Sequence, residues 1–377
     1  MTIETAEEIA GATAVRGTVA AGYEPVREEF AALLAAEPGL AAQVAARVDG
    51  RQVVDLWGGP GLAGDSLLGV FSSTKGIAFL AVALLVQDGA LDLDREVRAY
   101  WPEFAAAGKA GVTVRELLGH RAGLIGVDDG FSPAELADDA AIAERLAAQR
   151  PYWRPGAAFG YHSLTVGALA GELVRRVSGA GLRDHYRSRL VEPHGVDFHL
   201  GVPDGELARV VDVLPPRPPA EPAEPIEPES IAGIAYNLQH PTQIELAALP
   251  NHPEFRAGGP ASVGGFGSAR GLAALYAAAL ELLTPETAAE CAQPYSVGRD
   301  LVLDMERAYG LGFMVAVPYL GARAFGHDGA GGSMAFADPA AGLAFGYTRR
   351  RVPTPGGAGQ DAARLATSVR TCARRLR

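Results

Sequence analysis

The sequence has few cysteines, few lysines and no long apolar run. Its two cysteines, Cys291 and Cys372, have neither the number nor the spacing of a disulfide framework or a metal site, so we expect both to be reduced and structural. No run reaches the roughly 18 apolar residues that a membrane span needs. The acidic start, Met1 to Glu8, lacks the basic and apolar regions of a secretory signal. The default expectation is a cytoplasmic protein with no membrane partner.

Positive charge is outweighed by negative charge. The chain carries 33 Lys and Arg against 44 Asp and Glu, a net charge of −11, which argues against nucleic acid as a partner. Its eight histidines lack the short spacing of metal-ligand pairs, so we expect no metal. Gly59 to Gly64 matches Gly-x-Gly-x-x-Gly but follows a hairpin and contains a proline, so we expect no nucleotide and no other cofactor. A small molecule is the expected partner, and the oligomeric state stays open.

Lysine is so scarce that each position is informative. Only two of the 33 basic residues are lysine, and Lys75 stands three residues after Ser72 in Phe71-Ser72-Ser73-Thr74-Lys75-Gly76. Arginine cannot give up its proton in a protein, whereas a buried lysine can. On a helix, Ser-x-x-Lys places a hydroxyl and an amine on one face, one turn apart. That is the geometry of a serine nucleophile with a lysine base.

The apolar pattern predicts one antiparallel sheet formed by both ends of the chain. We expect a helix over 23–37, a hairpin over 43–57 and a buried helix over 73–88. Short strand-like runs over 311–347 precede an amphipathic helix over 361–376. The expected domain organisation is a tail at 1–22, a sheet domain at 23–90 and 255–377, and a mostly helical inserted domain at 91–254 that contains a proline-rich loop at 214–229.

Two later segments carry further polar side chains. Tyr161-His162-Ser163 precedes a helix expected over 164–177, where a tyrosine phenol can enter a cleft near the lysine. His327 lies in the glycine-rich run 325–333, which we interpret as an edge strand whose N–H groups can reach a substrate. His120 is expected to make a structural hydrogen bond.

Together and in this order, the motifs resemble those of the serine β-lactamase and penicillin-binding-protein superfamily, specifically class C β-lactamase-like hydrolases and family VIII carboxylesterases. The first motif, Ser-x-x-Lys, falls on Ser72 and Lys75, the second on Tyr161 and the third on 327–329. The resemblance covers roughly residues 20–375. It implies an α/β (α+β) fold of the β-lactamase/DD-peptidase type. An antiparallel sheet would be flanked by N- and C-terminal helices, with an inserted, mostly helical domain and the active site in the groove between.

The resemblance also implies roles for individual residues. Ser72 would be the nucleophile, and Lys75 and Tyr161 would exchange its proton as general base and acid. A neutral Lys75 requires its pKa to fall from about 10.4 toward 7, whereas an ionised Tyr161 beside a charged Lys75 meets the same need. Both assignments stay open. The oxyanion hole would be the N–H groups of Ser72 and Ala330. We expect substrate contacts from five residues, His327, Gly329, Ser163, His162 and Trp153.

Two departures from the family pattern favour an esterase. Ser163 stands where the lactamases carry Asn, and His327 replaces the third-motif lysine, with Asp328 beside it. Such a groove attracts the carboxylate of a penicillin less, and an ester leaving group needs less protonation than an amine. We therefore predict a carboxylesterase-type serine hydrolase that cleaves short-chain or aryl esters through an acyl-Ser72 intermediate.

Alternative functions are also compatible with these residues. An acyltransferase of secondary metabolism would pass the same acyl group to an alcohol or amine, and a weak β-lactamase or D-peptidase would cleave an amide. Intact Ser72, Lys75 and Tyr161 count against a noncatalytic binding relative. An α/β-hydrolase is excluded, because the nearest approach to Gly-x-Ser-x-Gly, at 331–335, ends in alanine.

Overall fold

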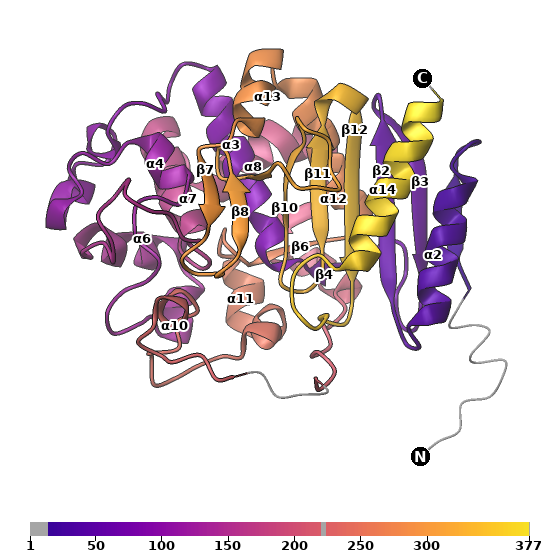
Figure 1. Cartoon of the computed structure of the whole chain (residues 1–377), viewed down its shortest axis with the longest axis horizontal. Helices are drawn as coiled ribbons and strands as arrows, with labels where there is room; N and C mark the ends of the chain where they lie inside the picture. Colours follow the sequence, from indigo (N-terminus) through magenta and orange to yellow (C-terminus); the bar gives the residue numbers. More distant parts are fainter. Residues whose placement is uncertain (1–13, 220–223, 377) are drawn as a thin grey trace.

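A nine-stranded antiparallel sheet organises the computed structural model, which describes residues 14–219 and 224–376 (Figure 1). The strand order is β1-β3-β2-β12-β11-β10-β9-β8-β7, so the first strands of the chain pair directly with the last. The bounds are β1 (Arg16–Val19), β2 (Ala42–Val48), β3 (Arg51–Gly58), β7 (Ser296–Arg299), β8 (Glu306–Tyr309), β9 (Met314–Val315), β10 (Phe325–Asp328), β11 (Met334–Asp338) and β12 (Leu343–Arg349).

A second, three-stranded sheet lies beside the segment that carries Ser72. Its order is β4-β6-β5, with bounds β4 (Leu68–Gly69), β5 (Phe198–Leu200) and β6 (Gly265–Gly267). Strand β4 leads into the 3₁₀ turn η1 (Phe71–Thr74), and the Gly265 N–H donates to Thr74 Oγ1 at 2.9 Å. The small sheet therefore holds the turn in place.

Helices cover both faces of the large sheet. Helices α2 and α14 pack together on one face, whereas α12 packs against β12 and β2 on the other (Figure 1). The bounds are α2 (Glu24–Ala36), α3 (Lys75–Gln87), α4 (Val114–Leu118), α5 (Pro133–Leu136), α6 (Asp139–Ala148), α7 (Val166–Ser178), α8 (Leu182–Tyr186), α9 (Glu192–His194), α10 (Ile231–Ala235), α11 (Pro253–Gly258), α12 (Ala269–Leu282), α13 (Pro285–Ala292) and α14 (Gln360–Arg375).

Alternating side chains of β11 and β12 divide between two cores. Phe336 and Phe345 stack at 5.1 Å between ring centroids in the core beneath α2 and α14. Ala335 and Ala344 face the opposite core, which includes residues of α12. A Cβ at Gly346 would lie 2.3 Å from the Ala269 carbonyl oxygen. Small residues on this face therefore let α12 approach the sheet closely.

The sequence pattern correctly predicts the helices and the hairpin near the two ends of the chain. The helix expected at 23–37, the hairpin at 43–57 and the helix at 361–376 are confirmed by α2, by β2 with β3, and by α14. Strand β1 is missed, because it lies in the stretch 1–22 that the pattern assigns to a tail. The first 13 residues of that stretch lie outside the described residues.

The proline-rich loop expected at 214–229 is anchored to the large sheet where it begins. The Leu214 N–H donates to the Arg350 carbonyl oxygen at 2.7 Å, and the Val352 N–H donates to the Leu214 carbonyl oxygen at 3.0 Å. Residues 220–223 of the loop lie outside the described part of the chain. The start of the loop is thus held against the residues that follow β12.

The position of His327 corrects one expectation. Strand β10 lies between β9 and β11, so it is not an edge strand in the sheet order. Strand β9 pairs only with Phe325 and Gly326, however. Beyond Gly326, the side of β10 away from β11 has no partner strand among the described residues, and this open stretch carries His327.

The two cysteines lie far apart in the chain, in different helices. Cys291 and Cys372 are buried and unpaired in α13 and α14. Within residues 14–219 and 224–376, no helix has the length and hydropathy required to cross a membrane.

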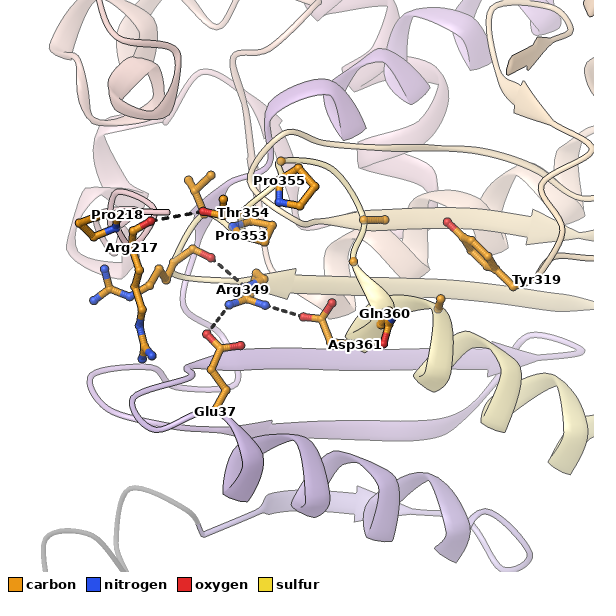
Figure 2. A pocket seen from close by; sticks show the side chains of 16 residues that line it. Glu37, Arg217, Pro218, Tyr319, Arg349, Pro353, Thr354, Pro355, Gln360 and Asp361 are labelled. Carbon is orange, nitrogen blue, oxygen red and sulfur yellow. Dashed lines mark hydrogen bonds and ion pairs between the residues drawn. The ribbon is translucent and has the colours of Figure 1, made fainter. Parts of the chain in front are cut away.

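A buried arginine ties β12 to both outer helices. Arg349 donates to Asp361 Oδ2 in α14 at 2.7 Å and to Glu37 Oε1 at the end of α2 at 2.6 Å (Figure 2). Only 6% of its side chain is exposed, and Asp361 also accepts a hydrogen bond from the Tyr347 hydroxyl at 2.6 Å. Removing the arginine would leave Asp361 buried without its cation.

We predict that Arg349→Met lowers the free energy of unfolding by about 3 kcal/mol, because breaking a buried ion pair leaves an uncompensated charge. Urea denaturation followed by circular dichroism measures the change. Arg364→Met is the matched control, because Arg364 is half exposed in its pair with Glu29 and should cost less than about 1 kcal/mol. Equal losses in the two variants would contradict the prediction.

Candidate active site

Ser72 lies in a turn between the small sheet and the buried helix α3. The residue before it, Phe71, has a φ of 49°, a left-handed conformation that is uncommon for a bulky side chain. Helix α3 begins at Lys75, two residues after the start expected from the apolar pattern, because Phe71–Thr74 forms a 3₁₀ turn. Ser72 is 8% exposed and lines a cavity, whereas Lys75 is fully buried.

The Lys75 amine is held by three oxygen atoms. Its Nζ lies 3.0 Å from Ser72 Oγ, 2.7 Å from the Ser163 carbonyl oxygen and 2.9 Å from the Ser262 carbonyl oxygen. An ammonium would donate to all three oxygens. A neutral amine would donate its two N–H bonds to the two carbonyls, which directs its lone pair toward Ser72 Oγ. The arrangement therefore suits an amine that accepts the serine proton.

Burial acts on this amine in the required direction. It lowers the pKa of Lys75 well below the ordinary value of 10.5, and the negative charge of Asp328 opposes part of that change. The other lysine, Lys109, lies elsewhere and donates to the carbonyl oxygens of Ala106 and Gln149 at 2.8 and 2.6 Å.

Tyr161 is placed by its own main chain and by the rings around it. Its N–H donates to Asp300 Oδ1 at 3.0 Å, and its ring stacks on Tyr309 at 5.9 Å between centroids. Lys75 Nζ lies 4.9 Å from the centre of the Tyr161 ring. Burial raises the pKa of Tyr161 well above its usual value, although a hydrogen bond with Ser72 acts in the opposite direction. Tyr161 is therefore a neutral phenol.

His120 holds the segment that carries Tyr161. Its Nδ1 accepts the His162 N–H at 3.1 Å, and its carbonyl oxygen accepts the Gly160 N–H at 3.1 Å. His120 is fully buried and has a φ of 60°. The structural role expected for this histidine is confirmed.

His327 presents an acceptor to Tyr161, not a positive charge. Its Nδ1 donates to the Asp328 carbonyl oxygen at 2.6 Å, so Nε2 is unprotonated and lies 3.5 Å from the Tyr161 hydroxyl. Burial, together with the nearby charge of Lys75, lowers the pKa of His327 to about 3. The ring is therefore neutral at physiological pH.

Ser72 and Ala330, whose N–H groups are expected to form the oxyanion hole, line the same cavity. Neither N–H donates a hydrogen bond to another of the described residues. Gly329 packs against the segment that leads into Ser72, where a Cβ would lie 2.3 Å from the Val70 carbonyl oxygen. A side chain at Gly329 would thus push β10 away from the turn that carries Ser72.

Two of the five expected substrate-binding residues line the cavity around Ser72, and three do not. His162 is fully buried, donates from Nδ1 to the Gly160 carbonyl oxygen and accepts the Leu124 N–H at Nε2, so it has no polar atom for a substrate. Trp153 packs against His162 and does not line the cavity. Gly329 likewise lies outside the lining. Ser163 and His327 do line the cavity, but Ser163 holds Lys75 through its main chain.

The cavity around Ser72 has a volume of about 320 Å³. Beyond the motif residues it is lined by residues of four segments that the sequence does not single out: Tyr236, Leu246, Val263, Leu303, Met305, Arg307, Tyr309, Met314, Gly356 and Gly357. No local pattern marks them, because they lie in loops and short strands. A larger cavity of about 850 Å³, lined by Arg349 and Asp361 (Figure 2), contains neither Ser72 nor Lys75.

The sheet, the inserted helices and the Ser-Lys-Tyr cluster define the class of serine β-lactamase and penicillin-binding-protein folds. The model of the family described as Beta-lactamase matches residues 26–369, and the chain belongs to that family.

Known relatives agree with this assignment. The chain is 32% identical over 341 residues to Esterase/beta-lactamase LipL of Mycobacterium tuberculosis, covering 83% of this chain and 77% of that protein. It is 41% identical to the structure of EstA from Arthrobacter nitroguajacolicus Rue61a, with a TM-score of 0.90 over 95% of this chain and 98% of that chain. A family VIII carboxylesterase structure is 31% identical, with a TM-score of 0.86 over 95% and 100% of the two chains. The predicted fold class is therefore confirmed.

Proposed function

We propose that the protein hydrolyses short-chain or aryl carboxylic esters through an acyl-Ser72 intermediate, with Lys75 as general base. The contact of Lys75 Nζ with Ser72 Oγ at 3.0 Å carries this proposal, because two carbonyl oxygens occupy the remaining donors of a neutral amine. The relatives named esterase and carboxylesterase support ester cleavage as the reaction.

In the proposed reaction, Lys75 takes the Ser72 proton as Oγ attacks the ester carbonyl carbon. The carbonyl electron pair moves to oxygen, where the N–H groups of Ser72 and Ala330 stabilise it. When the tetrahedral intermediate collapses, the bond to the leaving oxygen breaks. That oxygen receives the proton held by Lys75, which is passed on through Ser72 and Tyr161. A water molecule then attacks the acyl group by the same steps, which releases the carboxylic acid and regenerates free Ser72.

The neutral His327 and Tyr161 side chains favour an ester over a β-lactam or peptide. His327 offers Tyr161 an acceptor and adds no positive charge for a substrate carboxylate at the third motif. Tyr161, with its pKa raised by burial, is a weak acid. An alkoxide or phenoxide leaving group needs less help from such an acid than an amine does.

Mass spectrometry tests the intermediate. We expect purified protein that is quenched during turnover of para-nitrophenyl acetate to gain one acetyl group, located on Ser72 by peptide mapping. An adduct on another residue would contradict the proposal. Adding a short alcohol distinguishes a hydrolase from an acyltransferase, because an acyltransferase would form a new ester in preference to free acetate.

The decrease of kcat/KM at low pH, the acid limb of the pH–rate profile, should depend on Asp328. Lys75 must be unprotonated to accept a proton, so kcat/KM falls as pH falls through the Lys75 pKa. The Asp328 charge raises that pKa, and Asp328→Asn should therefore move the acid limb to lower pH. A pH–rate profile for para-nitrophenyl acetate measures the displacement. Asp304→Asn is the control, because Asp304 pairs with Arg299 at 2.6 Å outside the cavity; a displacement to higher pH in Asp328→Asn would contradict the assignment.

A further inference from the structure

Arg307 lines the candidate catalytic cavity without a partner of opposite charge. It lies in β8, partly buried, and its Nε is buried with no hydrogen-bond partner among the described residues. Its guanidinium also forms no ion pair with a carboxylate of that part of the chain. By contrast, Arg299 in the neighbouring strand β7 pairs with Asp304 at 2.6 Å. A guanidinium has five donors, and leaving a buried one such as Nε without an acceptor is costly.

The register of β8 places this cation close to the reaction centre. Arg307 and Tyr309 lie on the same face of the strand, two residues or about 7 Å apart. The Tyr309 ring stacks on Tyr161 with an interplanar angle of 7°. Arg307 is therefore about one strand repeat away from Tyr309, whose ring stacks on that of Tyr161. Leu303 and Met305, which also line the cavity, give this wall an apolar surface around the cation.

Among the described residues, the acidic groups near the cavity form no hydrogen bond or ion pair with Arg307 and have other partners. Asp328 is the carboxylate among the lining residues, and its Oδ2 accepts the Ala358 N–H at 3.1 Å. Burial raises the pKa of Asp328, and the charge of Arg307 is among the influences that lower it. Asp300 does not line the cavity and accepts the N–H groups of Tyr161 and Val302 at Oδ1.

We propose that Arg307 binds a carboxylate on the ester substrate, away from the bond that is cleaved. A carboxylate matches the paired donors of a guanidinium and supplies the missing acceptors. The preferred substrates are then carboxylate-bearing esters, in which the charge lies either on the leaving group or at the far end of the acyl chain. This inference rests on the proposed ester hydrolysis and adds a positive binding group that His327 does not provide.

Matched pairs of esters test the inference. The acetyl esters of para-hydroxybenzoate and para-hydroxybenzamide differ only in charge on the leaving group, and monoethyl glutarate and ethyl glutaramate differ only in charge on the acyl chain. We expect the wild type to prefer the charged member of at least one pair. Arg307→Met should lower kcat/KM for that member roughly 10- to 100-fold, mainly through KM, because a hydrogen-bonded charge pair is lost. The neutral member should change less than about threefold.

Two further variants identify the cause. Arg307→Lys should retain part of the charged preference, and Arg299→Met should retain all of it, because Arg299 lies outside the cavity lining. Equal losses for charged and neutral esters would show a structural role and overturn the inference. Turnover of neutral esters with no charged preference would overturn it while leaving the proposed function intact. Failure of the wild type to hydrolyse all four esters and para-nitrophenyl acetate would overturn both.

Discussion

Replacing Ser72 with alanine should lower kcat for para-nitrophenyl acetate by roughly 10⁴- to 10⁶-fold, because loss of the nucleophile removes the covalent route. The fold should remain, since Lys75 keeps its bonds to the carbonyl oxygens of Ser163 and Ser262. Initial rates of nitrophenolate release measure the effect. Circular dichroism and urea denaturation then show whether the variant is folded. Turnover that survives in a folded Ser72→Ala protein would mean that another group is the nucleophile.

Ser73→Ala is the matched control for this experiment. Ser73 lies in the same turn but faces away from Lys75, and its Oγ contacts Ser333 Oγ at 2.9 Å and the His327 carbonyl oxygen at 3.3 Å. Losing these neutral hydrogen bonds costs about 1 kcal/mol of stability. We expect kcat within about tenfold of the wild type, an effect of about 1 kcal/mol. If kcat of Ser73→Ala fell as far as that of Ser72→Ala, the loss of activity in both variants would be due to damage of the turn.

Replacing Lys75 should have the second largest effect. Lys75→Ala removes the proposed base, and kcat should fall roughly 10²- to 10⁴-fold. Lys75→Arg should be equally inactive, because arginine keeps its proton and cannot accept another from Ser72. Steady-state kinetics with para-nitrophenyl acetate measure both. An active Lys75→Arg enzyme would show that a positive charge, not a base, is needed at this position.

Two experiments separate the base from other roles of a buried lysine. Small primary amines should partly restore turnover in Lys75→Ala, and more basic amines should restore more of it. Lys109→Met is the control, because Lys109 bonds only main-chain oxygens away from the cavity and should change kcat less than about threefold. Absence of rescue with a folded Lys75→Ala protein would count against a simple base.

The predictable part of the site is the part that depends on local geometry. Ser72 and Lys75 are three residues apart at the start of a helix, so helical spacing alone brings their side chains into contact. The outer helices and the hairpin follow from apolar periodicity, because their buried faces pack against one sheet. The place of Tyr161 beside this pair came from the order of motifs in a known family, since no short-range rule connects it with Lys75.

The features of the site that the sequence did not predict depend on main-chain groups and on short strands. The carbonyl oxygens of Ser163 and Ser262 hold Lys75, but any residue can supply a carbonyl, so their sequence carries no signal. His162 was expected at the substrate, yet both of its ring nitrogens bond the main chain. Strand β8, which carries Arg307, has only four residues and no clear alternation. The cytoplasmic location, the domain division and the absence of a nucleic-acid partner stay predictions.

The sequence by itself was enough to identify the first motif, the class of fold and the scarcity of titratable amines. Each of these can be recognised from composition or from the spacing of residues close together in the chain. The burial that shifts the pKa values of the site residues is visible only in the tertiary structure. Burial lowers the pKa of Lys75 and raises that of Tyr161, and this favours a neutral amine as the base over an ionised phenol. The choice between them depends on how completely residues distant in the chain exclude water from both groups.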